Sequence, residues 1–144
     1  ESVLAIIEGE SLQEMLKEIY RVLKPNGTFF SNDSIWKEGT EPSVILEVNN
    51  YCKYNFDIIQ ANDIWCSLKD WKQLFKDIGF KHIEPVKLKP RPPKLKPRSG
   101  INITKATTML SPINLMNEII FKRKHNYIHE HGQNIEAYIF SMKK

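Results

Sequence analysis

The stretch that decides the fold is Glu18-Ile19-Tyr20-Arg21-Val22-Leu23-Lys24-Pro25-Asn26-Gly27-Thr28-Phe29-Phe30. Upstream, Ser11-Leu12-Gln13-Glu14 has the pattern of a capping box, and apolar residues then recur at three- and four-residue spacing. Proline cannot continue a helix and Asn-Gly accepts positive φ, so we expect this helix to span 11 to 24. The apolar run after the turn predicts a buried strand over 28 to 31. Helix, turn and buried strand together are typical of an α/β domain.

A second helix and two further strands are expected downstream. Ser67-Leu68-Lys69-Asp70 repeats the capping pattern, which predicts a helix over 68 to 78 that ends at Gly79. Strands are expected over 80 to 88, where Pro85 favours an edge or a bulge, and over 135 to 142. Because parallel neighbours need helical crossovers, we expect the two helices to lie on opposite faces of the sheet.

Composition indicates one ordinary globular domain. The 144 residues are 41% apolar and 26% charged, which disfavours disorder and coiled-coil arrays. No apolar run approaches the roughly 20 residues that span a bilayer, so we expect no membrane-spanning segment. The proline-rich stretch 87 to 98 carries six positive charges and no acidic residue. Since the whole chain has a net charge of +4, the rest of the chain has a net charge of −2. This local basicity predicts an exposed linker and disfavours nucleic acid as a partner.

Neither the cysteines nor the histidines form a familiar metal or catalytic set. Cys52 and Cys66 have no CxxC spacing, which predicts a reducing cytoplasmic compartment and two small buried hydrophobes. His125, His129 and His131 lie close together and the first two have ligand-like spacing, but no acidic or cysteine residue completes a site with them. We therefore expect no metal.

Polar residues follow the strand at 28 to 30, in the order Ser31-Asn32-Asp33-Ser34-Ile35-Trp36. Sheets of this class bind ligands at the carboxyl ends of their strands, so this segment is a candidate ligand edge. The alternative interpretation is a capped turn beside a packed tryptophan. No GxGxxG, GxxxxGK[ST], GxSxG or HExxH motif is present.

The 18 to 30 stretch resembles the "E-x-x-R-V-L-K-P-G-G" element of class I S-adenosylmethionine-dependent methyltransferases, and is most similar to the ubiquinone and menaquinone biosynthesis branch. Three further segments resemble the family in the right order: Glu1-Ser2-Val3-Leu4-Ala5 beyond the fourth strand, Asn32 to Trp36 after the fifth, and Trp71 to Phe80 before the sixth. The segment Ala137 to Met142 is similar to the antiparallel seventh strand. Apolar pattern alone would make Val3 to Ile7 a strand, whereas the resemblance places it just past one.

The resemblance implies the carboxyl-terminal part of a Rossmann-like sheet. The family's glycine-rich loop and its ribose-binding acidic residue would lie upstream of Glu1, so we expect this chain to be a fragment that binds S-adenosylmethionine poorly by itself. Residues 37 to 66 would form a lid or substrate-side insertion, and 87 to 134 an insertion between the last two strands. Asp33 would be the catalytic base, with Glu1 across the cleft. The cofactor-binding residues would be Glu1 and Ser2, and the substrate-binding residues Asn32, Trp36, Tyr51 and Trp65.

Two classes of function remain open. The first is a methyltransferase that acts on a small molecule, with an aromatic lid that suits a substrate of hydrocarbon or ring character. The second is a non-enzymatic binding or scaffold module that retains half of a methyltransferase-like fold. A strand followed by a glycine-rich turn, upstream in the complete gene, would favour the first.

Overall fold

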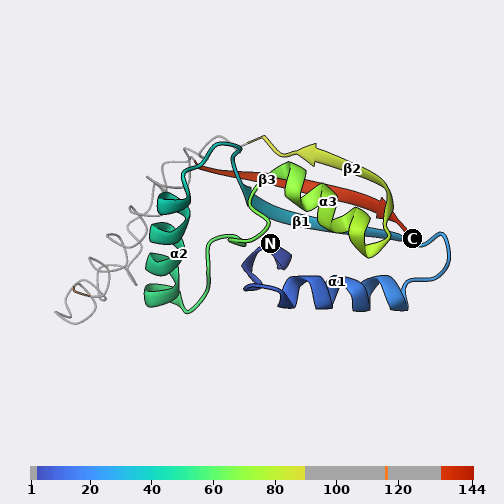
Figure 1. The fold of residues 1–144 in the computed structure, drawn as a ribbon, viewed down its shortest axis with the longest axis horizontal. Helices are drawn as coiled ribbons and strands as arrows, with labels where there is room; N and C mark the ends of the chain where they lie inside the picture. Colours follow the sequence, from blue (N-terminus) through green and yellow to red (C-terminus); the bar gives the residue numbers. More distant parts are fainter. Residues whose placement is uncertain (1–2, 90–115, 117–133) are drawn as a thin grey trace, which may run out of the picture. The chain divides into compact units, whose positions relative to one another are not determined.

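In the part of the chain that the structure describes, three strands form one sheet in the order β1-β3-β2 (Figure 1). They are β1 (Thr28–Trp36), β2 (Lys81–Lys87) and β3 (Ile135–Lys143), and β3 is antiparallel to both neighbours. The structure is a computed structural model that describes residues 3–89, 116 and 134–144. The mixed α/β class with an antiparallel last strand is therefore confirmed. Because β3 lies between them, β1 and β2 run parallel without being neighbours.

Within residues 3–89, four helical segments accompany the sheet: the 3-10 turn η1 (Leu4–Ile6), α1 (Ser11–Val22), α2 (Pro42–Phe56) and α3 (Leu68–Ile78). The capping box of Ser67 and Asp70 starts α3, and Gly79 ends it with a φ of 114°. Both features of α3 are as expected from the sequence. η1 shows that the segment from Val3 to Ile7 is not a strand, which agrees with the methyltransferase resemblance.

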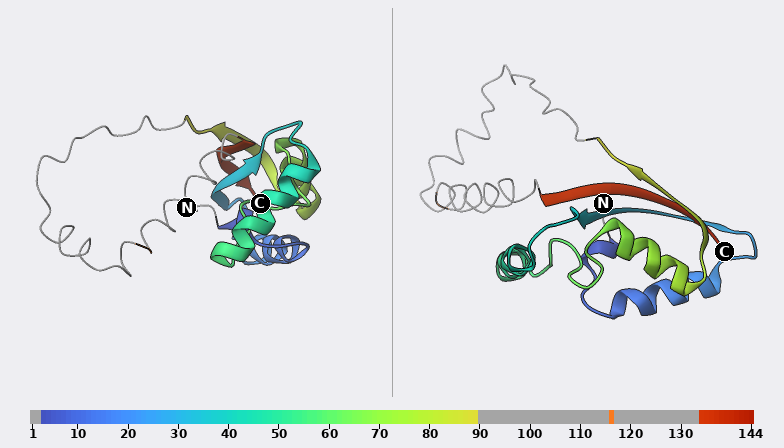
Figure 2. Two further views of the ribbon diagram at one scale, coloured as in Figure 1. Left: turned by 90° about the vertical axis from the view of Figure 1, so that its left-hand side faces the viewer. Right: turned by 45° about the horizontal axis from the view of Figure 1, so that its top comes forward.

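The two amphipathic helices lie on the same face of the sheet, so the expectation of opposite faces is wrong (Figure 2). Leu12 and Leu16 of α1 share one buried cluster with Trp71 and Phe75 of α3. The strands contribute to that cluster from the face on which Phe140 lies, stacked against Trp71 at 5.9 Å between ring centroids. The prediction assumed that β1 and β2 are neighbours, whereas β3 separates them.

Strand β1 is longer than expected and includes the polar segment that the sequence placed after it. All nine residues pair with β3, from Thr28 opposite Lys143 to Trp36 opposite Ile135. The candidate ligand edge is therefore the second half of a strand and not a turn. Local sequence could not indicate this, because the pairing partner lies about a hundred residues further along the chain.

Within the described residues, no helix is long and apolar enough to cross a membrane. The structure does not describe the histidines His125, His129 and His131, the basic residues from Arg91 to Arg98, or the predicted insertion 87 to 134 apart from residues 87–89, 116 and 134. Cys52 is buried and Cys66 is half-buried, both as free thiols. Burial raises the pKa of both thiols, that of Cys66 to about 11, which suits packing better than nucleophilic chemistry.

Candidate functional site

Asp33 is a buried carboxylate on the helix-covered face of β1, only 1% exposed. Its Oδ1 atom accepts hydrogen bonds from the backbone N–H groups of Leu4 at 3.0 Å and Ala5 at 3.1 Å. These two amides belong to η1, whose first turn leaves its N–H groups without partners inside the helix. Asp33 thus anchors the segment before α1 to the strand.

The second oxygen of Asp33 has no such partner. Asp33 Oδ2 and Ser31 Oγ are both buried, and neither makes a hydrogen bond with the described residues. Burial raises the pKa of Asp33, and the nearby Ser31 hydroxyl with the backbone amides of Ala5 and Leu4 opposes this rise only in part. A carboxyl group in this state could accept a proton from a ligand group that reaches Oδ2.

Trp36 lies in the interior at 1% exposure, so the structure does not place it at the rim of a cleft. Its indole Nε1 donates to the backbone oxygen of Asn62 at 3.1 Å. Asn32 is exposed and lies one position before the buried Asp33, and neighbouring strand residues point to opposite faces. The sequence predicts that Asn32 and Asp33 belong to one ligand edge, whereas in the structure their side chains point to opposite faces of the sheet.

Tyr51 and Trp65 are each half-buried and come from different elements. Tyr51 lies in α2, and Trp65 lies in the loop before α3, where it packs against the main buried cluster. Tyr54, which with Trp36, Tyr51, Phe56 and Trp65 makes up the aromatic stretch that the sequence predicts as a lid, is almost fully exposed. The two residues proposed for the cofactor, Glu1 and Ser2, lie outside the described residues.

Sequence reasoning missed Asn62, which joins three segments. Its Nδ2 donates to the backbone oxygen of Ile7 at 2.7 Å, and its Oδ1 accepts from the backbone N–H groups of Ile64 and Trp65. Its own backbone oxygen receives the Trp36 indole. The local pattern Asn62-Asp63 indicates a turn, but nothing in it indicates contacts with residues 7 and 36.

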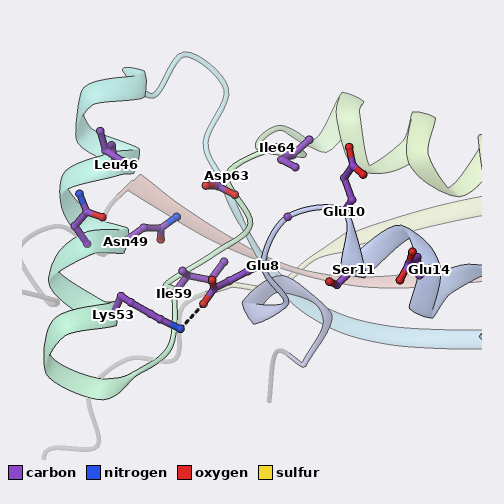
Figure 3. A pocket seen from close by; sticks show the side chains of 12 residues that line it. Glu8, Glu10, Ser11, Glu14, Leu46, Asn49, Lys53, Ile59, Asp63 and Ile64 are labelled. Carbon is purple, nitrogen blue, oxygen red and sulfur yellow. Dashed lines mark hydrogen bonds and ion pairs between the residues drawn. The ribbon is translucent and has the colours of Figure 1, made fainter.

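A groove of about 520 Å³ opens between the start of α1, the helix α2 and the loop that follows α2 (Figure 3). Its charged lining consists of Glu8, Glu10, Glu14, Asp63 and Lys53. Lys53 Nζ lies 2.6 Å from Glu8 Oε1, while no ion pair is formed by the other three carboxylates within the described part of the chain. The carboxylates outnumber the ammonium group, so the groove favours a positively charged ligand over an anion.

The described side chains hold no group of three or more histidine, cysteine or acidic residues that could bind a metal ion. A cofactor would have to be held by hydrogen bonds and apolar contacts, for which the described groove and strand edge offer carboxylates, amides and aromatic rings. The described residues contain no glycine-rich loop of the kind that binds a phosphate or pyrophosphate group.

No protein-family model and no curated protein matches this chain. A solved structure from Galdieria sulphuraria, described provisionally as a sarcosine dimethylglycine methyltransferase, matches it with a TM-score of 0.55 and 17% sequence identity. The match covers 92% of this chain and 47% of the Galdieria protein, so the chain spans about half the length of that structure. At this identity the likeness shows the fold alone, which is half of a methyltransferase fold.

Proposed function

We propose that this chain supplies the carboxyl-terminal half of an S-adenosylmethionine-dependent methyltransferase that acts on a small molecule. The observation that carries the proposal is the fold match over 92% of the chain, together with the methyltransferase-like segments that occur in order along it. Methyl transfer of this kind is an in-line displacement, in which a protein chiefly aligns donor and acceptor and excludes water. Few catalytic side chains are therefore required.

The site residues that we propose fall into three groups: a base, residues that contact the substrate and residues that contact the methyl donor. Asp33 would accept the acceptor's proton, because its raised pKa is nearer to the range in which general bases work. The substrate side would be formed by Asn32, Trp36, Tyr51 and Trp65. Trp36 is buried, so it would act indirectly, through the hydrogen bond that its indole N–H donates to the backbone oxygen of Asn62. Glu1 and Ser2 would contact the methyl donor.

The acceptor would carry an amine. This part of the proposal is supported by the acidic groove beside α2, which none of the residues named above lines and whose volume of about 520 Å³ suits a small molecule. Asp63→Asn removes one groove carboxylate, and Glu84→Gln, on exposed β2, is the matched control. We expect Asp63→Asn to raise the KM for an amine acceptor several-fold, whereas the control leaves it unchanged. An unchanged KM in both variants would contradict the amine assignment.

The function is tested by calorimetry with S-adenosylmethionine on two proteins: residues 1–144 alone, and the product of the complete gene. We expect micromolar binding and methyl transfer only for a polypeptide that also carries a strand followed by a glycine-rich turn. Micromolar binding by residues 1–144 would contradict the half-domain proposal. A complete product that has the fold but neither binds the donor nor transfers methyl groups would favour the scaffold alternative.

A further inference from the structure

The side of α3 that faces away from the buried cluster carries a row of positive charges. Lys69, Lys72 and Lys76 follow one another at three- and four-residue spacing, which places them on one face of the helix. Lys69 and Lys76 are exposed, and Lys72 is half-buried. A hollow of about 390 Å³ lies along this row, lined by Glu38, Leu68, Lys69, Lys72, Gln73 and Lys76.

No described carboxylate neutralises these three lysines. Every ion pair within the described residues is made by a cation outside the hollow. The two acidic residues of α3 are engaged elsewhere: Asp70 Oδ2 accepts from Ser67 in the capping box, and Asp77 Oδ1 accepts from Gln73 Nε2 at 2.7 Å. The lysines also outnumber Glu38, the one acidic residue of the described lining, so the hollow keeps an excess of positive charge.

This charge pattern destabilises α3 in two ways. Like charges three or four residues apart on a helix repel, which applies to Lys69 with Lys72 and to Lys72 with Lys76. Lys69 also lies in the first turn of α3, where the positive end of the helix dipole disfavours a cation. An anionic occupant of the hollow would relieve both effects. The pattern therefore indicates a negatively charged partner.

The length of the lysine row favours a polypeptide over a small anion. A rise of about 1.5 Å per residue places Lys69 and Lys76 about 10 Å apart along the helix axis. A single phosphate or carboxylate group cannot contact all three lysines, so the occupant must carry several negative charges in a row. The described lining has no aromatic ring on which a nucleic acid base could stack, whereas Leu68 and the lysine stems offer apolar contacts to side chains.

We propose that this hollow on α3 is the docking site of an acidic segment of a partner protein. Carboxylates of the segment would pair with Lys69, Lys72 and Lys76, and an apolar side chain between them would contact Leu68. Exposed charge pairs of this kind steer a partner and set its register more than they add affinity, so binding should be micromolar and weaken with salt. Docking here is independent of methyl transfer, because none of the lining residues belongs to the site proposed for it.

The test measures, by fluorescence anisotropy, the binding of two dye-labelled peptides to residues 1–144. One is Glu-Glu-Leu-Glu-Glu-Ala-Leu-Glu-Glu, and the other has glutamine in place of every glutamate. We expect only the acidic peptide to bind. Lys72→Glu should weaken its binding about tenfold, whereas Lys17→Glu, the same charge change at an exposed position of α1 outside the hollow, should change it by less than about twofold.

Thermal melts of the same two variants separate docking from folding. At low salt we expect Lys72→Glu to melt above wild type, because the new carboxylate lies between Lys69 and Lys76 in place of a third cation. Lys17→Glu should bring no such gain, since Glu14 precedes it by three residues on the same helix. A variant that is more stable and yet binds more weakly has lost the docking contact and not the fold.

Several outcomes would overturn the proposal. They are absence of binding at millimolar peptide, equal binding of the glutamine peptide, and equal weakening by Lys72→Glu and Lys17→Glu, which would show an attraction to net charge alone. Tighter binding of a thymidine oligonucleotide than of the acidic peptide would show a nucleic acid surface instead. None of these measurements includes S-adenosylmethionine, so their failure would reject the docking site and leave the methyltransferase proposal to its own calorimetric test.

Discussion

Asp33 illustrates how much a single residue depends on partners that are distant in sequence. Its carboxyl group is paired with backbone amides 28 and 29 residues away, and burial rather than a neighbouring charge dominates its pKa. The same side chain is therefore both a structural anchor for η1 and our proposed base. The two roles predict different outcomes for the same pair of substitutions.

We expect Asp33→Asn to keep near wild-type stability at neutral pH, because the amide oxygen can still accept from Leu4 and Ala5. Asp33→Ala removes the acceptor and should cost about 1–3 kcal/mol for each amide left unpaired. Chemical denaturation measures both variants. Equal stability of Asp33→Ala and wild type would contradict the anchoring role, and full methyl transfer by Asp33→Asn in the complete protein would contradict the catalytic one.

The pH dependence of stability provides an independent check on Asp33. Its folded-state pKa is raised above the ordinary value of 3.8, so the folded protein holds this proton to higher pH than the unfolded chain does. The stability it contributes is fully present below the unfolded pKa and is lost as pH rises through the folded pKa. Thermal melts between pH 4 and 7 should thus show a stabilisation on acidification that is smaller in Asp33→Asn.

Trp36 is a second residue whose role depends on its surroundings. Because it is fully buried, Trp36→Ala should lower the free energy of unfolding by about 3–5 kcal/mol. Trp36→Phe keeps most of the apolar volume but leaves the Asn62 carbonyl without its donor, at about 1–3 kcal/mol. Urea denaturation distinguishes the two costs. A Trp36→Ala protein as stable as wild type would instead support a position at the rim of a cleft.

At the scale of elements, the cap of α3 could be read locally, whereas the capping box expected at Ser11 does not form: Glu10 is the N-cap of α1 and no side chain caps it. Strand length could not be read locally. The capping box at Ser67 and the left-handed Gly79 depend on residues within one turn of α3, and both form as expected. β1 continues through three polar residues, Asn32, Asp33 and Ser34, and on to Trp36, because β3 pairs with every one of them. Strand propensity alone would have ended it at 31, since Asn and Asp are depleted in strands.

The cap of α3 can be tested by itself. Ser67 Oγ accepts from the Asp70 N–H at 3.3 Å and donates to Asp70 Oδ2 at 2.8 Å. We expect Ser67→Ala to cost about 1 kcal/mol of stability. Ser43→Ala, at an exposed position in the first turn of α2 that makes no cap hydrogen bond, should change stability by less than about 0.5 kcal/mol. Equal effects at the two sites would contradict the capping box.

At the scale of the whole molecule, both described amphipathic helices lie on one face of the three-stranded sheet. In sheets of α/β proteins both faces are usually covered. The opposite face here exposes Phe30, Ile139 and Val86 on three adjacent strands.

The sequence by itself determined the α/β class, the limits of α3, the start of α1 and the place of the three strands along the chain. These features depend on apolar spacing, prolines, glycines and caps, which act within a few residues. Only the tertiary structure decided that β3 lies between β1 and β2, that both helices share a face, and that Trp36 and Asp33 are buried. Each of these depends on contacts between residues far apart in sequence, whose free energy no local pattern contains.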